Sequence, residues 1–192
     1  MKMAKKFLAV ALAGVLALSV LTGCGDSANT KSIAEAMSDM VKVGGITVKE
    51  DTELNTKAKA IVEALVNADE AEPEALAEND STETEGILTE GQKTKIMTIM
   101  TDSYKDQFVW ISVTETKGYN TTAQASNLLH GMDKGEVNAP EDKEPADTWY
   151  IGTTTFTKGD KTYRFAVITA APKAEQTPAG GESTDQGNTE KK

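Results

Sequence analysis

The chain has 192 residues, with 30 acidic and 20 basic side chains and a formal net charge of −10 at pH 7. This length is typical of one domain. A strongly acidic surface repels phosphate backbones and anionic lipid head groups, which argues against nucleic-acid binding and against electrostatic attachment to membranes. The only cysteine is Cys24, so an internal disulfide is excluded.

The first 23 residues predict a secretory signal. Lys2, Lys5 and Lys6 form a basic start, and the run 7–21 that follows is uncharged and mostly apolar. This run is shorter than the ~20 residues that a membrane-spanning helix needs. The leader is therefore expected to direct export rather than to span the membrane.

The string LTGC at 21–24 resembles the lipobox of bacterial lipoproteins. In that family the cysteine thiol is joined to diacylglycerol and the peptide is cut before it. The resemblance implies that 1–23 is removed and that Cys24 carries a lipid anchor on the extracytoplasmic face of the cell membrane. Two acyl chains, at about 0.8 kcal/mol per buried CH₂, suffice for stable anchoring. The alternatives are a conventional cleavage site near an ordinary Cys24 and an uncleaved anchor.

Residues 24–30 form a short polar tether, and the folded domain is expected over 31–171. Ser32 and Glu35 have the spacing of a capping box and predict the start of a first helix, which Gly44 and Gly45 end. The inward stripe expected for this helix is Ile33, Ala36, Met37, Met40 and Val41.

A short extended segment is expected at 46–49, followed by a second helix that begins at Asp51 or Thr52. Its apolar residues recur at helical spacing, which indicates a buried face rather than a cofactor contact. The predicted stripe is Leu54, Ala58, Ile61, Val62 and Leu65.

The stretch 69–90 carries many carboxylates and no Lys or Arg. Low apolar content and the clustering of like charges predict a mobile, solvated insert. The alternative is a calcium site, but the spacing of an EF-hand loop is absent.

Thr89 and Gln92 predict a third helix with Ile96, Ile99, Met100 and Tyr104 turned inward. The run 108–113 has two apolar faces, which indicates a central strand covered on both sides. A fourth helix is expected from Thr121, capped with Gln124 three residues on. Its stripe is Ala125, Leu128, Leu129 and Met132.

A polar loop is predicted over 135–147, where Pro140 and Pro145 disfavour helix. A C-terminal hairpin is expected from 150–157 and 162–169. In its second strand Tyr163, Phe165 and Val167 share the core face, with Arg164 and Ala166 on the other. From 172 to 192 no large apolar residue occurs, which predicts a disordered tail. The element order predicts an α+β fold: a layered α-β-α sandwich with a mostly antiparallel sheet.

Three strings of the chain are similar to patterns of the extracellular CAP (SCP-like) domain. These are GGITVKEDTELNTKAKAIVEAL at 44–65, KGYNTTAQASNLL at 117–129 and YIGTTTFTKGDKTYRFAVI at 150–168. The resemblance implies an α-β-α sandwich with CAP-like element order. Members of that family that bind a divalent metal use two His and two acidic residues in a central cleft.

This chain departs from the CAP pattern at the metal site. It has one histidine, His130, and the family's ENI and SPGHR strings are absent. If the chain is a relative of the CAP domain, this departure implies that it has lost the metal-binding cleft. His130 is expected near a helix C-terminus in a structural or exposed position. No metal and no cofactor are therefore predicted.

Signals of catalysis are weak. A single His leaves no multi-histidine zinc set, and a serine nucleophile, Ser112 or Ser126, would need His130 as its base. Neither GxSxG nor a phosphate-binding glycine loop is present. The sequence predicts a non-catalytic binding or interaction module anchored to the membrane. The alternative is a cell-envelope hydrolase that uses acidic residues in a CAP-like cleft.

Overall fold

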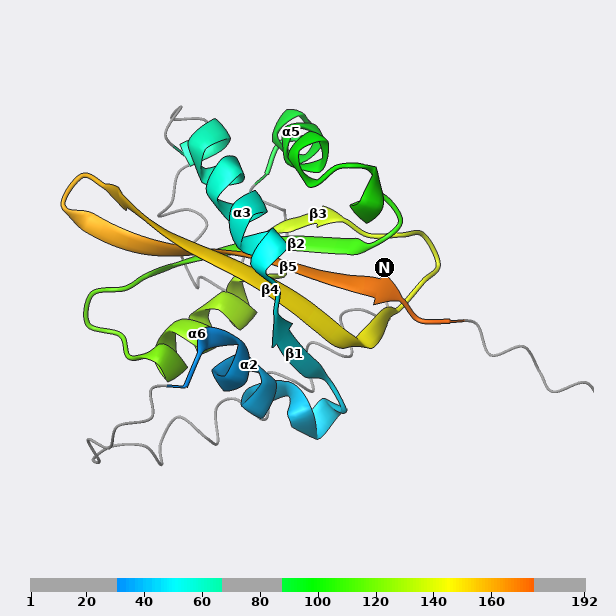
Figure 1. Cartoon of the computed structure of the whole chain (residues 1–192), viewed down its shortest axis with the longest axis horizontal. Coiled ribbons are helices and arrows are strands. Elements are labelled where there is room, and N and C mark those ends of the chain that lie inside the picture. Colours follow the sequence, from blue (N-terminus) through cyan, green and yellow to red (C-terminus); the bar gives the residue numbers. More distant parts are fainter. Residues whose placement is uncertain (1–30, 67–87, 175–192) are drawn as a thin grey trace, which may run out of the picture.

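The computed structural model describes residues 31–66 and 88–174 (Figure 1). The predicted leader, Cys24, the tether and most of the acidic insert and of the tail lie outside these ranges. Within them, no helix combines the length and the apolar character that a membrane span requires.

The described residues form an α+β fold with one open, mixed sheet of five strands in the order β1-β4-β5-β2-β3. β1 pairs with β4 in parallel, and the other neighbouring pairs are antiparallel. The α+β class is therefore confirmed, whereas the sheet is mixed. The strands are β1 (Thr47–Glu50), β2 (Phe108–Glu115), β3 (Glu136–Asn138), β4 (Pro145–Lys158) and β5 (Lys161–Pro172).

Helices cover both faces of the sheet. In Figure 1, α3 and α5 lie on one side of the strands and α2 and α6 on the other. The four α-helices of the described ranges are α2 (Ile33–Val41), α3 (Thr52–Ile61), α5 (Glu90–Met100) and α6 (Thr121–Gly131). Shorter helical turns occupy Lys42–Gly44 and Asp102–Tyr104, and a π-helical turn, Val62–Val66, extends α3.

Each face has its own apolar core. The core under α3 and α5 includes Leu54, Ala58, Ile61, Ile96, Met100, Val109, Ile111, Phe156, Tyr163, Phe165 and Val167. The core under α2 and α6 includes Met37, Met40, Val48, Phe108, Leu128, Met132, Trp149, Ile151, Ala166, Ile168 and Ala170. Every residue of the first, second and fourth predicted helix stripes is buried.

The helices begin where their capping residues predict. In α2, the amide of Glu35 donates to the Ser32 hydroxyl at 3.1 Å, and the Ser32 amide donates to the Glu35 carboxylate at 2.8 Å. Thr89 caps α5 with Gln92 in the same way. At the C-terminal side of α2, Gly45 has φ = 80°, a conformation that favours glycine, so the predicted stop is confirmed.

Two details of the predicted helices are wrong. The N-cap of α6 is Asn120 rather than Thr121, because the Asn120 side chain accepts the amide of Ala123 at 2.9 Å. Gln124 instead donates its side-chain amide to the carbonyl of Tyr119 at 2.8 Å. Beyond α5, Thr101 has φ = 75° and ends the helix. Tyr104 is buried as predicted, but it belongs to the separate helical turn Asp102–Tyr104.

The loop and hairpin boundaries also shift. The predicted loop 135–147 contains the short edge strand β3, and β4 already begins at Pro145. A two-residue turn at 159–160 joins β4 to β5. The predicted core face of β5 is confirmed, since Phe165 is 1% exposed. Both faces of β2 are buried as well, which confirms a strand covered on two sides.

α3 lies unusually close to β4 at Gly152. A Cβ atom added there would come within 2.0 Å of the Leu54 carbonyl carbon. Only a residue without a side chain lets the start of α3 approach the strand this closely. The contact holds α3 in place over the edge of the sheet where β1 ends.

Candidate functional site

A pocket of about 300 Å³ lies on the face of the sheet that α2 and α6 cover. It is found where both helices begin, and the strands beneath it are β1, β4 and β5. Its lining residues are Lys31, Ser32, Ile33, Ala34, Glu50, Thr121, Ile151, Thr153 and Arg164.

The pocket forms where the apolar core of this face ends. Along β5, buried Ile168 and Ala166 are followed on the same face by half-buried Arg164. Along β4, buried Ile151 is followed by half-buried Thr153. Polar side chains thus replace apolar ones on both strands at the point where the covering helices start.

Arg164 lines the pocket and is the only arginine in the chain. Its Nε donates to Oε1 of Gln124 at 2.8 Å, and one terminal nitrogen donates to Oγ1 of Thr153 at 3.4 Å. Both partners are neutral, and no carboxylate within the described ranges forms an ion pair with it. A guanidinium has five N–H groups, so these contacts leave donors for a ligand.

Burial lowers the pKa of Arg164 from its ordinary value, because the charged guanidinium loses hydration without gaining a counter-ion. An arginine nevertheless stays protonated at neutral pH. The pocket therefore holds a positive charge that no carboxylate of residues 31–66 and 88–174 neutralises by an ion pair.

Two helix N-termini border the pocket, and that of α2 already carries the capping-box carboxylate of Glu35. The capping side chains of Ser32 and Asn120 accept only the third amide of their helices, those of Glu35 and Ala123. The earlier amides of α2 and α6 have no side-chain cap within the described ranges. Uncapped amides and the helix dipole favour negative charge at such an end.

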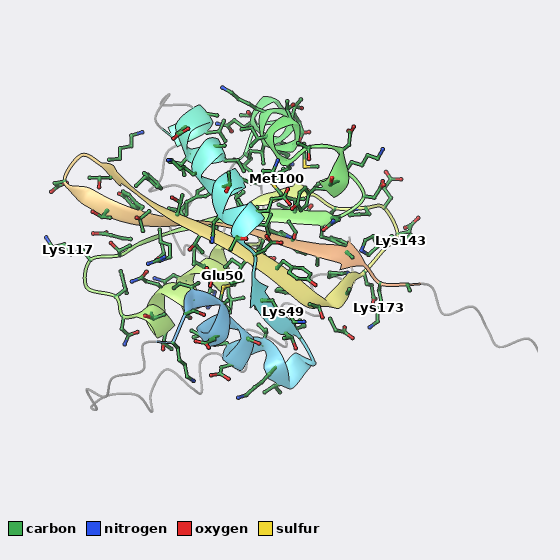
Figure 2. All side chains as sticks on the ribbon, in the orientation of Figure 1. Lys49, Glu50, Met100, Lys117, Lys143 and Lys173 are labelled. Carbon is green, nitrogen blue, oxygen red and sulfur yellow. The ribbon has the colours of Figure 1, made fainter. Side chains whose placement is uncertain are left out.

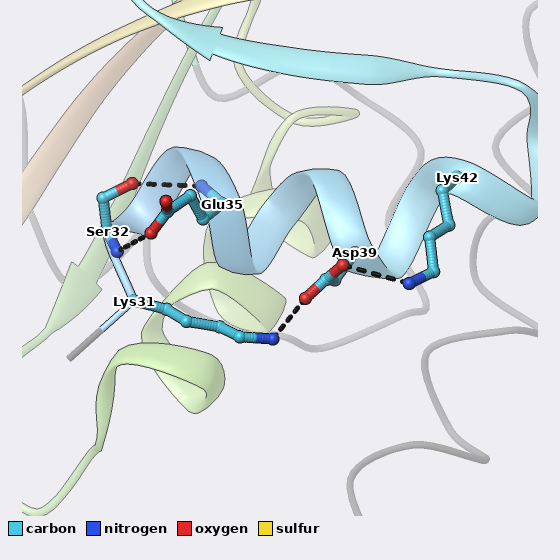
Figure 3. A network of polar contacts seen from close by, with 5 residues as sticks. All are labelled: Lys31, Ser32, Glu35, Asp39 and Lys42. Carbon is cyan, nitrogen blue, oxygen red and sulfur yellow. Dashed lines mark hydrogen bonds and ion pairs between the residues drawn. The ribbon is translucent and has the colours of Figure 1, made fainter. Parts of the chain in front are cut away.

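Lys31 lines the pocket, but its charge is already compensated. Its ammonium pairs with the carboxylate of Asp39, which also binds Lys42 at 3.0 Å (Figure 3). These hydrogen bonds, first the one from Lys31, lower the pKa of Asp39 below its ordinary value. Arg164 is therefore the lining cation that remains available to a ligand.

Glu50 supplies the one carboxylate on the lining. It lies at the end of β1 (Figure 2) and accepts a long hydrogen bond of 3.4 Å from the side-chain amide of Asn55. Glu50 and Arg164 do not form an ion pair with each other. The pocket thus has an anionic and a cationic wall that are kept apart.

The residues considered for catalysis are not assembled at this pocket. His130 is close to the C-terminal end of α6, whereas Thr121 at the other end lines the pocket. At about 1.5 Å per residue, nearly the whole helix separates them. Ser112 is buried under the helical layer with no hydrogen-bond partner in the described part, and neither Ser112 nor Ser126 lines the pocket.

No group of three or more His, Cys, Asp or Glu that could hold a metal occurs within 31–66 and 88–174. Cys24, the predicted lipidation site, lies outside these ranges, so lipidation stays a prediction. Sequence reasoning placed Arg164 only on the face opposite the core residues and did not single it out. One feature of the sequence could have drawn attention to it: Arg164 is the only arginine among 20 basic residues.

Comparison of the chain with protein-family models, with curated proteins and with solved structures found no match. The resemblances to lipoproteins and to the CAP domain therefore stay predictions. The pocket is therefore the basis of the function proposed below.

Proposed function

We propose that this protein is a non-catalytic binding module, held on the extracytoplasmic face of the membrane by a lipid on Cys24. Its pocket binds a small ligand that carries a carboxylate. One observation supports the pocket assignment above the others: Arg164 is half-buried, and its side-chain partners among the described residues, Gln124 and Thr153, are neutral.

The half-buried charge of Arg164 favours the binding of an anion as its counter-ion. Removing a guanidinium from water without a partner anion opposes folding. A ligand carboxylate would offset this loss, since planar guanidinium and carboxylate groups form paired, charge-assisted hydrogen bonds. A pocket of about 300 Å³ is at the lower end of the range for small-molecule sites. A small organic acid fits both the charge and the size.

The anchor would keep the pocket close to the membrane. Eight residue steps separate Cys24 from Ser32, which lines the pocket. A fully extended chain of that length reaches about 28 Å. The proposed site therefore binds its ligand near the outer surface of the membrane.

The competing hypothesis is a cell-envelope hydrolase with acidic residues in a CAP-like cleft. Hydrolysis of a glycan needs a pair of carboxyl groups a few ångströms apart. This pocket has Glu50 as its one lining carboxylate, and His130 is at the far end of α6. The arrangement favours binding over hydrolysis.

The anchor is tested by replacing the proposed acceptor thiol, Cys24→Ala. We expect the parent to enter the detergent phase on temperature-induced phase separation and the variant to stay in the aqueous phase. A processed variant that still enters the detergent phase would contradict lipid attachment at Cys24.

The pocket is tested by calorimetric titration with propionate and with its uncharged analogue propionamide. We expect propionate to bind the parent and the Lys31→Gln variant, and propionamide to bind neither. The Arg164→Gln variant should bind neither compound. Equal binding of propionate by the parent and by Arg164→Gln would contradict the assignment.

A further inference from the structure

We infer that the ligand of the Arg164 pocket is a free α-amino acid in its zwitterionic form, with its carboxylate on Arg164 and its ammonium on Glu50. The inference rests on the proposed function and names the substrate class of the same site. Its basis is the pair of opposite, unpaired charges on the lining of one pocket.

The two charges belong to different elements that the sheet holds at a defined spacing. Glu50 pairs with Ile151 across the parallel ladder of β1 and β4, and Thr153 lies two residues farther along β4. One strand spacing and two residue rises place the Cα atoms of Glu50 and Thr153 about 8 Å apart. The guanidinium of Arg164 lies 3.4 Å from the Thr153 hydroxyl.

The Cα spacing and the shared pocket lining place both charged side chains within reach of one small ligand. Standard bond lengths put the ammonium and the carboxylate oxygens of an α-amino acid about 3 Å apart. A hydrogen bond of about 2.8 Å at each end extends the reach between the two protein groups to about 9 Å. A dipeptide places its two charges about 3.5 Å farther apart, so titration with both compounds distinguishes the two lengths.

Glu50 also distinguishes this pocket from a simple anion site. A carboxylate on the lining repels a second negative charge, which weakens binding of phosphate or of a dicarboxylate. The same carboxylate attracts a ligand ammonium. Glu50 keeps most of its hydrogen-bonding capacity for it, because its partner among the described residues is the side-chain amide of Asn55, 3.4 Å away.

The remaining wall fits an aliphatic side chain. Ile33 and Ala34 at the start of α2 and Ile151 on β4 are apolar residues of the lining. The Ser32 hydroxyl on the same lining already accepts the amide of Glu35, so these apolar residues supply the main contacts for a ligand side chain. An amino acid such as valine matches the charge pattern and the apolar wall together.

The test is calorimetric titration of the full chain, purified in a nonionic detergent, with four compounds. These are L-valine, 3-methylbutanoate, which lacks the ammonium, valinamide, which lacks the carboxylate, and the dipeptide valyl-valine. We expect L-valine to bind at least about tenfold more tightly than each of the others, since a charge-assisted hydrogen bond contributes roughly a factor of ten or more.

Variants assign each contact to its residue. Glu50→Gln should remove the preference for L-valine over 3-methylbutanoate without weakening the binding of 3-methylbutanoate. Arg164→Gln should abolish the binding of both, and Arg164→Lys, which keeps the charge, should retain part of it. Glu53→Gln, an exposed acidic position in the first turn of α3, is the matched control and should bind as the parent does.

The outcomes separate this inference from the proposed function. If 3-methylbutanoate binds as tightly as L-valine and depends on Arg164, the carboxylate site stands and the amino-acid assignment is overturned. Tighter binding of valyl-valine would overturn a free amino acid in favour of a peptide. If no carboxylate binds, both the proposed function and this inference fail.

Discussion

The two faces of the sheet differ in how far their apolar cores extend. On the face under α3 and α5, β5 presents Tyr163, Phe165 and Val167 in succession, all nearly inaccessible to solvent. On the face under α2 and α6, the same strand presents Ile168 and Ala166 and then the cation Arg164.

The difference separates a structural role from the proposed ligand-binding role within one strand. Phe165 and Arg164 are adjacent in sequence and point to opposite faces. Phe165 fills a core that α3 and α5 close, whereas Arg164 lies beside the starts of α2 and α6, where a pocket of about 300 Å³ remains. A strand covered on one face and partly uncovered on the other can thus hold the fold together and present a charge to a ligand.

The largest effect on stability is expected from Phe165→Ala. Truncating a fully buried Phe removes apolar contacts and leaves a cavity, which lowers the free energy of unfolding by about 3–5 kcal/mol. Urea unfolding of the variant and the parent measures the difference. An unchanged midpoint would mean that the α3 and α5 face is not the main core.

Gly152→Ala tests the close approach of α3 to β4 on the same face. The added methyl group would overlap the backbone of Leu54, so α3 has to shift, at a cost of about 1–3 kcal/mol or more. The control is Gly91→Ala, an exposed position in α5 where the new Cβ meets nothing closer than 3.9 Å. We expect that control to be neutral or slightly stabilising in thermal unfolding. Equal effects at both positions would contradict the packing described for α3.

Arg164→Met tests whether the charge of Arg164 contributes to stability or to binding. It removes a half-buried charge and its hydrogen bond to Gln124 but keeps the length of the side chain. These changes oppose each other, so the free energy of unfolding should stay within about 1 kcal/mol of the parent value. Binding of carboxylates should be lost at the same time. A large loss of stability would make Arg164 a structural residue instead.

The smallest effect concerns the ion pairs beside the pocket. Lys31 lowers the pKa of Asp39 in the folded protein, so the carboxylate stabilises the fold above the unfolded pKa of about 3.8 and loses this effect as the pH falls through the lower folded value. Asp39 is largely solvated, and the contribution is therefore small. An NMR titration should show its midpoint below 3.8 in the parent and closer to 3.8 in Lys31→Met. A midpoint that does not move in the variant would contradict the pairing.

Local signals in the sequence predicted much of this fold. The capping boxes at Ser32 and Thr89 predicted two helix starts, and the apolar spacing predicted the buried stripes. The two apolar sides of β2 predicted a strand covered on both faces. Each of these features depends on residues within a few positions of one another, where periodicity and capping determine the structure.

The arrangement of the sheet and the pocket could not be predicted in the same way. β1 and β4 pair in parallel although about a hundred residues separate Thr47 from Thr148, and no local pattern specifies that partner. The pocket combines the end of β1, the start of α2, the start of α6 and the middle of the β4–β5 hairpin. Arg164 becomes conspicuous only when its neutral partners Gln124 and Thr153 are known.

An NMR signal of Arg164 tests most directly whether this residue binds a ligand. Because the chain contains one arginine, protein labelled with ¹⁵N-arginine gives a single Nε–Hε resonance that reports on the pocket alone. We predict that this resonance shifts in a saturable manner when L-valine is added and does not shift with valinamide. A resonance that stays unchanged at saturating concentrations of every carboxylate tested would contradict the claim that Arg164 binds a ligand.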